Sequence, residues 1–244
     1  MTPSEATDAL EEAKREAGER AVEEVRSGMR LGLGTGSTVR YFLEGLAREI
    51  SQGRLEDIEG VPTSVQTRER ANALGIPLVG LAEAGELDLA VDGADEVSPG
   101  LDLIKGMGGA LLREKMIVQA SHRFVVVADA GKSVDRLGTR SPLPVEVVPF
   151  AWRSHLSLFR RIGARPVARE TGDGELYITD NGNLVVDLHF DEGIADPHGL
   201  DALLRMRAGV VETGLFLGMA DTAFVAPSDG QGKLQIRRRQ KETG

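Results

Sequence analysis

Residues 124–128 are an unbroken apolar run, Phe-Val-Val-Val-Ala, between Arg123 and Asp129. A strand that is apolar at every position has no wet face, which is typical of a parallel sheet covered by helices on both sides. Upstream, helical patterns alternate with further apolar runs at 29–34, 58–62, 77–81 and 87–91. The alternation predicts a doubly wound, mostly parallel, Rossmann-like α/β sheet that binds ligands at the carboxyl ends of its strands.

The pattern changes after Lys132. Hairpin turn sequences, among them Asp180-Asn-Gly-Asn183, separate extended segments that we expect to be strands at 165–170, 175–179 and 184–190. In the last of these, Asp187 and His189 alternate with apolar residues, as in a sheet with one wet face. We therefore expect residues 1–135 and 210–244 to form an α/β catalytic domain, and residues 136–209 to form an inserted small α+β lobe.

The charge balance limits the partners. The 244 residues carry a formal net charge of −9, with a pI near 5.1. Such a chain repels nucleic acid and anionic membranes at long range, so we expect neither as a partner. Arg237-Arg-Arg239, with Gly230 and Gly232 before it, is instead predicted to be a polar tail.

The absence of cysteine excludes disulfides, thiolate metal sites and cysteine nucleophiles. No apolar run reaches about 18 residues, the length that a membrane-spanning helix needs. The N-terminal residues, rich in glutamate, lack the apolar core of a signal peptide. We expect a soluble, cytoplasmic protein.

A glycine turn with hydroxyl side chains, Gly34-Thr-Gly-Ser-Thr38, stands between a predicted strand and a helical pattern. Ser37 occupies the place of the third glycine of a dinucleotide-binding motif, no Walker A lysine is present, and Ser37 is not in a G-x-S-x-G elbow. These departures argue against a nicotinamide enzyme and a serine hydrolase. We expect Thr35, Gly36, Ser37 and Thr38 to bind a phosphate or hydroxyl group; the alternative is a helix start without a ligand.

A second group of polar residues lies between Asp88 and Lys115. A predicted strand ends in Asp92-Gly93-Ala94-Asp95, and Lys105 precedes a glycine turn, Gly106-Met107-Gly108-Gly109, that leads into a helix containing Glu114. Two carboxylates, a cation, an anion cradle and a base predict a site for a small anionic substrate that undergoes proton transfer. Lys132, at the end of another predicted strand, could reach the same site.

Each of these groups also has a structural explanation. Asp92, Asp95 and Lys132 are ordinary loop residues, and Glu114 could belong to a solvated helix face. A metal site is disfavoured, because no histidine stands near the acids and the histidines at 122, 155, 189 and 198 lack ligand spacing. The apolar neighbours of Glu114 on its helix instead leave it on the side of Ala110, facing the glycine turn.

At these residues the chain resembles ribose-5-phosphate isomerase of the A type. The matching segments occur in family order from about residue 5 to residue 230, which is nearly the whole chain. They are Gly32-Leu-Gly-Thr-Gly-Ser-Thr38, Asp88-Leu-Ala-Val-Asp-Gly-Ala-Asp-Glu96, Lys105-Gly-Met-Gly-Gly-Ala-Leu-Leu-Arg-Glu-Lys115, Val127-Ala-Asp-Ala-Gly-Lys132, Pro142-Leu-Pro-Val-Glu-Val147 and Thr179-Asp-Asn-Gly-Asn183. Met107 departs from the family's glycine loop.

The resemblance implies an aldose–ketose isomerase that interconverts D-ribose 5-phosphate and D-ribulose 5-phosphate in the non-oxidative pentose phosphate pathway. It also implies no metal, no organic cofactor, and a homo-oligomer, a dimer or possibly a tetramer. The family's catalytic residues fall on Glu114, Asp92 and Lys105. Its substrate-binding residues fall on Thr35, Gly36, Ser37, Thr38, Asp92, Gly93, Ala94, Asp95, Lys105, Gly106, Met107, Gly108 and Lys132.

The reaction moves a proton between C2 and C1 through an enediolate, and one carboxylate, Glu114, can serve both directions. Lys105 and the glycine-loop N–H groups are the expected donors to the enediolate oxygen. Asp92 would carry the proton for ring opening, and Asp95 would accept a substrate hydroxyl. Two alternatives stay open: a sugar-phosphate-binding regulator without turnover, and an amino-sugar phosphate deaminase or acyl-CoA transferase of similar architecture.

Overall fold

The computed structural model describes residues 3–227 and 233–239, without the side chains of residues 3–6. The chain divides into two compact units. The first contains Met1–Ala94, Arg113–Ser133 and Met219–Gly244, and the second contains Asp95–Leu112 and Val134–Gly218. The chain therefore passes from the first unit to the second and back twice.

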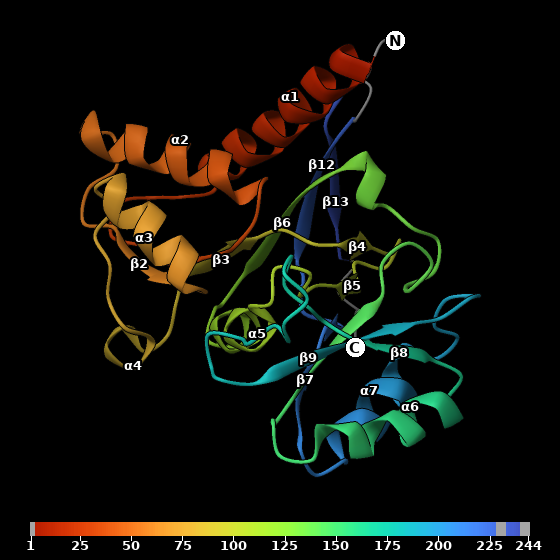
Figure 1. Cartoon of the computed structure of the whole chain (residues 1–244). Helices are drawn as coiled ribbons and strands as arrows, with labels where there is room; N and C mark the ends of the chain where they lie inside the picture. The colour runs from red at the N-terminus through yellow and green to blue at the C-terminus, as the bar shows by residue number, and fades with distance from the viewer. Residues whose placement is uncertain (1–2, 228–232, 240–244) are drawn as a thin grey trace, which may run out of the picture. The chain divides into compact units, whose positions relative to one another are not determined.

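The first unit is built on a six-stranded sheet, counted over the described residues, with the strand order β13-β12-β6-β3-β1-β2 (Figure 1). Neighbouring strands from β12 to β2 are parallel, and β13 is antiparallel to β12. The strands are β1 Arg30–Leu33, β2 Glu59–Pro62, β3 Leu89–Asp92, β6 Phe124–Asp129, β12 Thr222–Ala226 and β13 Gln235–Arg238. The helices are α1 Pro3–Val22, α2 Val39–Ser51, α3 Val65–Ala73, α4 Leu81–Ala84, α5 Leu111–Gln119 and the 3-10 helix η1 Ala130–Lys132.

Helices cover both faces of this sheet. On one face, Leu33 of β1 belongs to the same buried cluster as Phe42 of α2. The neighbouring Gly32 points to the other face, because side chains alternate along a strand. A Cβ built at Gly32 would lie 2.4 Å from Cγ2 of Ile117 in α5. The doubly wound prediction is confirmed, and burial on both faces explains why residues 124–128 contain no polar side chain.

The prediction of a polar tail that contains Arg237–Arg239 is wrong for Arg237 and Arg238. Gln235–Arg238 forms β13, whose residue Arg238 pairs with Thr222 of β12. The pairing supplies hydrogen-bond partners for the edge of β12, and buried backbone groups require such partners. Local composition did not indicate it, because Gln235–Arg238 is mostly polar and exposed and lacks the apolar run that marked the other strands of this sheet. Gly230 and Gly232 lie outside the described residues.

The second unit contains two antiparallel sheets, with the orders β10-β7-β9-β8 and β11-β5-β4. Their strands are β4 Glu96–Val97, β5 Leu103–Ile104, β7 Leu143–Val147, β8 Arg165–Ala168, β9 Leu184–His189, β10 Val210–Thr213 and β11 Leu215–Phe216. The helices are the 3-10 helix η2 Trp152–His155, α6 Leu156–Arg161 and α7 Pro197–Arg205. Phe159 of α6 and Leu204 of α7 share one buried core with Val145 and Val186 of the larger sheet. This is the predicted small α+β lobe.

The observed division differs from the predicted boundaries in three places. Residues 95–112, residues 134–135 and residues 210–218 belong to the second unit, not to the first. The reason is strand pairing, since β4 and β5 form a sheet with β11, and β10 pairs with β7. Two predicted strands are also reduced: residues 175–179 and 77–81 make only isolated bridges, such as Ile178 to Leu184 and Gly60 to Leu78.

His155 makes the stability of the second unit sensitive to acid. It is 3% exposed, and its Nδ1 accepts a hydrogen bond from Nε of Arg207 at 3.4 Å. Burial, and then the charge of Arg207, lower the pKa of His155 below its ordinary value. Folding therefore favours the neutral imidazole. The stabilisation is complete above about pH 6.5 and is lost as the pH falls through the lower, folded-state pKa.

We expect the free energy of unfolding to decrease between pH 7 and pH 5.5, by at most about 1.4 kcal/mol per pH unit from this one proton. Urea unfolding at several pH values measures the decrease, which should be smaller in His155→Gln. A matched control is His122→Gln, because the His122 side chain is 64% exposed. Equal pH profiles for the natural protein and His155→Gln would contradict the assignment.

Candidate active site

Apart from Glu114, the predicted site residues of the first unit lie at the carboxyl ends of three neighbouring strands. Residues 34–38 follow β1, Gly93 and Ala94 follow Asp92 at the end of β3, and Lys132 ends η1 after β6. β3 pairs with β1 on one side and with β6 on the other. Since β1 lies between β2 and β3, the ends of β1 and β3 are at the topological switch point, where open α/β sheets bind ligands.

Asp92 holds the turn at residues 34–38 in place. It is 1% exposed, and its Oδ1 accepts hydrogen bonds from the N–H groups of Thr35 at 3.0 Å and of Gly93 at 2.7 Å. Gly34 passes so close to this carboxylate that a Cβ built there would lie 2.3 Å from Oδ1. The turn therefore requires a glycine at position 34 because any side chain would displace Asp92.

Gly34→Ala is expected to destabilise the protein by about 1–3 kcal/mol, the usual cost of overpacking, and to lower the thermal midpoint by several degrees. Differential scanning calorimetry measures the change. Gly80→Ala is the matched control in the same unit, because Gly80 has a φ of −80° and a Cβ there would meet nothing within 4 Å. Equal midpoints for the two variants would show that the turn adapts to a side chain at position 34.

The Thr35 hydroxyl belongs to a cluster of hydroxyl groups. Its Oγ1 lies 2.8 Å from Oγ1 of Thr63, 2.8 Å from Oγ of Ser64 and 3.0 Å from Oγ1 of Thr67. Thr67 in turn donates to the carbonyl of Gly34 at 2.8 Å. The Thr35 side chain thus stabilises the turn from within, while the next two residues of the turn, Gly36 and Ser37, are exposed.

Glu114 is buried. It lies in the first turn of α5 and is 4% exposed, so its alternative interpretation as a surface residue is wrong. Burial of a carboxylate is unfavourable unless polar groups surround it, and buried titratable side chains concentrate at functional sites. Lys115, beside it in the sequence, is 1% exposed. The start of α5 therefore holds two ionisable side chains, Glu114 and Lys115, away from water. Lys132, at the end of η1, is partly buried.

The other predicted residues belong to the second unit, where β5 leads into the glycine loop, defined here as residues 105–109. Lys105 is 3% exposed, and its Nζ lies 5.4 Å from the centroid of the Phe216 ring. Such a distance gives a cation–π attraction. Met107 donates its N–H to Oδ2 of Asp95 at 3.0 Å, while 44% of Met107 is exposed. Asp95 was expected to bind the substrate. In the structure its carboxylate also accepts a hydrogen bond from the glycine loop and so helps to shape that loop.

Arg169, Asp187 and Tyr177 were not predicted, yet all three are associated with the glycine loop. The Arg169 guanidinium forms a two-pronged ion pair with Asp187 and donates to the carbonyls of Gly106 and Met107. Asp187 is 9% exposed, so its expected position on a wet sheet face is wrong. The alternation along β9 correctly placed Asp187 on the opposite face from its apolar neighbours. Only the tertiary structure shows that Arg169 covers Asp187 on that face.

Tyr177 packs against the end of the glycine loop. A Cβ built at Gly109 would lie 2.2 Å from the Tyr177 hydroxyl oxygen, and the φ of Gly109 is +77°. Burial raises the pKa of Tyr177 above its ordinary value, so the hydroxyl stays protonated and donates weakly to the carbonyl of Gly108 at 3.4 Å. The close approach of the ring requires glycine at position 109.

Two buried carboxylates in the motif segments hold loops of the second unit. Glu96 accepts hydrogen bonds at 2.6 Å from the backbone N–H groups of Gly138, Arg140 and Ser141. Glu146 accepts at its Oε1 from Thr179 at 3.0 Å and from Asn183 at 2.9 Å. Both glutamates are 0% exposed. The segments 142–147 and 179–183 are therefore connected through a buried side chain.

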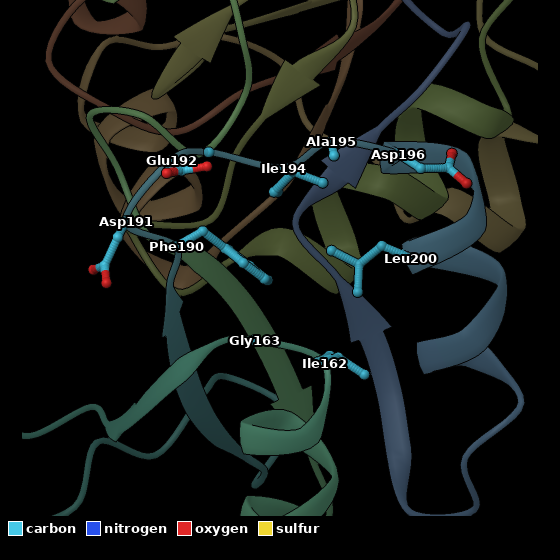
Figure 2. A pocket seen from close by; sticks show the side chains of 10 residues that line it. Ile162, Gly163, Phe190, Asp191, Glu192, Ile194, Ala195, Asp196 and Leu200 are labelled. Carbon is cyan, nitrogen blue, oxygen red and sulfur yellow. The ribbon is translucent and has the colours of Figure 1, made fainter.

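The second unit also has a pocket of about 400 Å³, which the predicted site residues do not line. Figure 2 shows Phe190 and Leu200 pointing toward one another across it, with the carboxylates of Asp191 and Asp196 pointing away. Asp196 accepts a hydrogen bond from the N–H of Gly199 at 2.9 Å and so caps α7. The acidic residues are thus accounted for by helix capping and solvent exposure.

No group of three or more His, Asp or Glu side chains could hold a metal ion within residues 3–227 and 233–239. Among the helices of the same residues, none is long and apolar enough to cross a membrane.

Comparison with known proteins gives one consistent family. The family model of ribose 5-phosphate isomerase A (phosphoriboisomerase A) matches residues 59–230. A ribose-5-phosphate isomerase A of Roseiflexus castenholzii is 51% identical over 222 residues, which are 91% of this chain and 94% of that protein. A probable chloroplastic ribose-5-phosphate isomerase 3 of Arabidopsis thaliana is 47% identical over 225 residues, 90% of this chain and 82% of that protein.

Solved structures agree with these sequence relatives. A D-ribose-5-phosphate isomerase in complex with phospho-erythronic acid is 38% identical and has a TM-score of 0.89, covering 94% of this chain and 99% of that chain. Ribose 5-phosphate isomerase from Plasmodium falciparum is 35% identical and has a TM-score of 0.91, covering 95% of this chain and 100% of that chain. The resemblance found in the sequence motifs is thereby confirmed.

Proposed function

Because the chain belongs to the ribose-5-phosphate isomerase A family, we propose that it interconverts ribose 5-phosphate and ribulose 5-phosphate through an enediolate, with Glu114 as the base. As a member of this family the chain is an aldose–ketose isomerase. The finer points, namely the intermediate, the base and the substrate contacts, are the proposal. A cytoplasmic location and a homo-oligomer stay predictions.

The burial of Glu114 carries the proposal. A base that removes a weakly acidic proton from carbon acts best out of bulk water, where electrostatic interactions with the developing negative charge are strongest, and Glu114 is 4% exposed. Its place at the start of α5 gives the carboxylate a rigid support. Glutamate suits this role because one carboxylate removes the proton from C2 and delivers it to C1, or the reverse.

The developing enediolate needs donors, and a phosphate needs an anion site. We assign Lys105 and the N–H groups of the glycine loop to the first task. Residues 35–38, at the start of α2, suit an anion, because a helix N-terminus favours negative charge. Lys132, which ends η1 after β6, is a further cation for the substrate.

Asp92 and Asp95 have roles that follow from their hydrogen bonds. Asp92 Oδ1 accepts from two backbone N–H groups and so holds the turn at residues 34–38. We propose that Oδ2 assists ring opening. Asp95 accepts from Met107 N–H through its Oδ2, which leaves Oδ1 to accept a substrate hydroxyl.

A complex of one relative supports an anionic intermediate. Phospho-erythronic acid, present in that solved structure, combines a phosphate with a planar carboxylate. An enediolate is also planar and negatively charged, so a site that accepts this acid suits the proposed intermediate. We propose that the present chain binds the same acid competitively with ribose 5-phosphate.

The proposal is tested by following ribose 5-phosphate turnover in D₂O with a chelator present. An enediolate predicts metal-independent turnover and deuterium at C1 of ribulose 5-phosphate. Turnover that the chelator abolishes, or a C2 hydrogen transferred to C1 without any solvent deuterium, would contradict the mechanism. Turnover of an amino-sugar phosphate or an acyl-CoA in place of the pentose phosphate would contradict the substrate.

A further inference from the structure

Arg169 is bound on both sides within the second unit. Its Nε donates to Oδ2 of Asp187 at 2.9 Å, and its Nη2 donates to Oδ1 of the same carboxylate. On the other side, Nη1 donates to the carbonyl of Gly106 at 2.7 Å and to the carbonyl of Met107 at 2.9 Å. One guanidinium thus joins β9 to the glycine loop.

The ion pair is largely removed from water, with side-chain exposures of 10% for Arg169 and 12% for Asp187. Burial of two charges is costly, and the pair adds stability only if its remaining donors are also satisfied. The loop carbonyls supply those acceptors. A lysine could not replace this arrangement, because only the planar, forked guanidinium binds a carboxylate with one edge and carbonyls with another.

The contacts determine which edge of the loop faces outward. In a planar trans peptide the C=O and the following N–H point in opposite directions, and no cis bond occurs among the described residues. Holding the Gly106 carbonyl therefore directs the N–H of Met107 toward Asp95, its observed acceptor at 3.0 Å. Holding the Met107 carbonyl likewise turns the N–H of Gly108 away from the guanidinium.

A loop of this composition has little stiffness of its own. Gly106 and Gly109 have φ values of +109° and +77°, and glycine populates many backbone conformations in the unfolded chain. Within the loop, the N–H of Gly109 donates to the carbonyl of Gly106 at 2.9 Å. The same carbonyl accepts from Arg169, so the guanidinium reinforces the turn at its first residue.

We propose that Arg169, oriented by Asp187, is a positioning residue for the isomerisation. It holds the Gly106 and Met107 carbonyls on one side of the glycine loop and so presents the opposite edge, with the N–H of Gly108, to an anionic oxygen of the sugar phosphate. This inference rests on the proposed function of the loop as a donor to the substrate. Arg169 itself does not touch the reacting atoms.

The test compares Arg169→Lys, Arg169→Ala and Asp187→Asn with the natural protein. For each, kcat and KM for ribose 5-phosphate, the dissociation constant of phospho-erythronic acid and the thermal midpoint are measured. We expect kcat/KM to fall by roughly 10² in the Arg169 variants, the effect of a misplacement of about 1 Å, with a higher KM and weaker binding of the acid. Guanidinium ion at millimolar concentration should restore part of the activity of Arg169→Ala.

Arg205→Ala is the matched control. Arg205 also forms an ion pair in the second unit, with Glu212 at 2.8 Å and Asp201 at 2.9 Å, but it does not contact the glycine loop. This variant should keep its KM and show no response to guanidinium ion. A response equal to that of Arg169→Ala would mean that the added ion acts nonspecifically, and it would overturn the rescue.

The inference is overturned if folded Arg169→Lys and Arg169→Ala keep the natural KM, kcat/KM and affinity for phospho-erythronic acid. A lower thermal midpoint with unchanged KM would assign Arg169 to stability alone and would also overturn it. If the natural protein binds the acid without turnover, the proposed function fails. The ratio of dissociation constants between the natural protein and Arg169→Lys then still decides the positioning role.

Discussion

Glu114→Gln is expected to lower kcat for ribose 5-phosphate by roughly 10²–10⁴, the usual contribution of a general base. Glutamine has nearly the shape of glutamate but cannot accept a proton at neutral pH. Since the position is 4% exposed, the isosteric change also avoids a cavity. KM should change little, because the lost interaction develops in the transition state. Coupled spectrophotometric assays of ribulose 5-phosphate formation measure both constants.

Glu86→Gln serves as the control, because it makes the same chemical change in the first unit at a side chain that is 85% exposed. It should turn over at the natural rate. Circular dichroism establishes that both variants are folded. If Glu114→Gln were folded and as active as the control, Glu114 would be discarded as the base, while the isomerase activity itself would stand.

Glu96→Gln is expected to destabilise the protein by about 2–4 kcal/mol, the range for losing charge-assisted hydrogen bonds to buried backbone donors. The carboxylate is 0% exposed and accepts from three N–H groups at 2.6 Å. A glutamine amide has one oxygen, so its NH₂ group would face backbone N–H donors. The segment that leads into β7 would lose its anchor.

Urea unfolding measures this loss, with Glu175→Gln as the control because Glu175 is an exposed residue of the same unit. The control should unfold at the natural midpoint. A Glu96→Gln midpoint equal to that of the control would show that the loop at residues 138–141 does not depend on the carboxylate for stability.

Local sequence information was enough for the architecture of the first unit. The apolar run at 124–128 and the alternating helical patterns indicate strands covered on both faces, and both faces are covered. This prediction succeeds because the spacing of apolar residues along a segment reflects whether the segment is a helix or a strand. The motifs around Gly34, Asp92 and Lys105 could also be recognised from the sequence, because each is a short continuous segment with special backbone or charge requirements.

The candidate site was only partly predictable. The residues at 35–38, Asp92 and Lys132 were correctly expected at strand ends, because the position of a loop after a strand follows from the chain itself. The apolar neighbours of Glu114 on its helix argued against a solvated position, but the extent of its burial follows only from the tertiary structure. Arg169 had no local signal, because its function in the structure depends on partners in β9 and in the glycine loop.

The sequence by itself determined the α/β class of the first unit, the family and the positions of the chemically distinctive residues. The tertiary structure decided that Gln235–Arg238 is a strand, that residues 95–112 belong with the second unit, and that Asp187 is buried against Arg169. The physical reason is the range of the interactions. Helix and strand periodicity arises between near neighbours in the chain, whereas edge-strand pairing and buried ion pairs join segments whose separation no local pattern records.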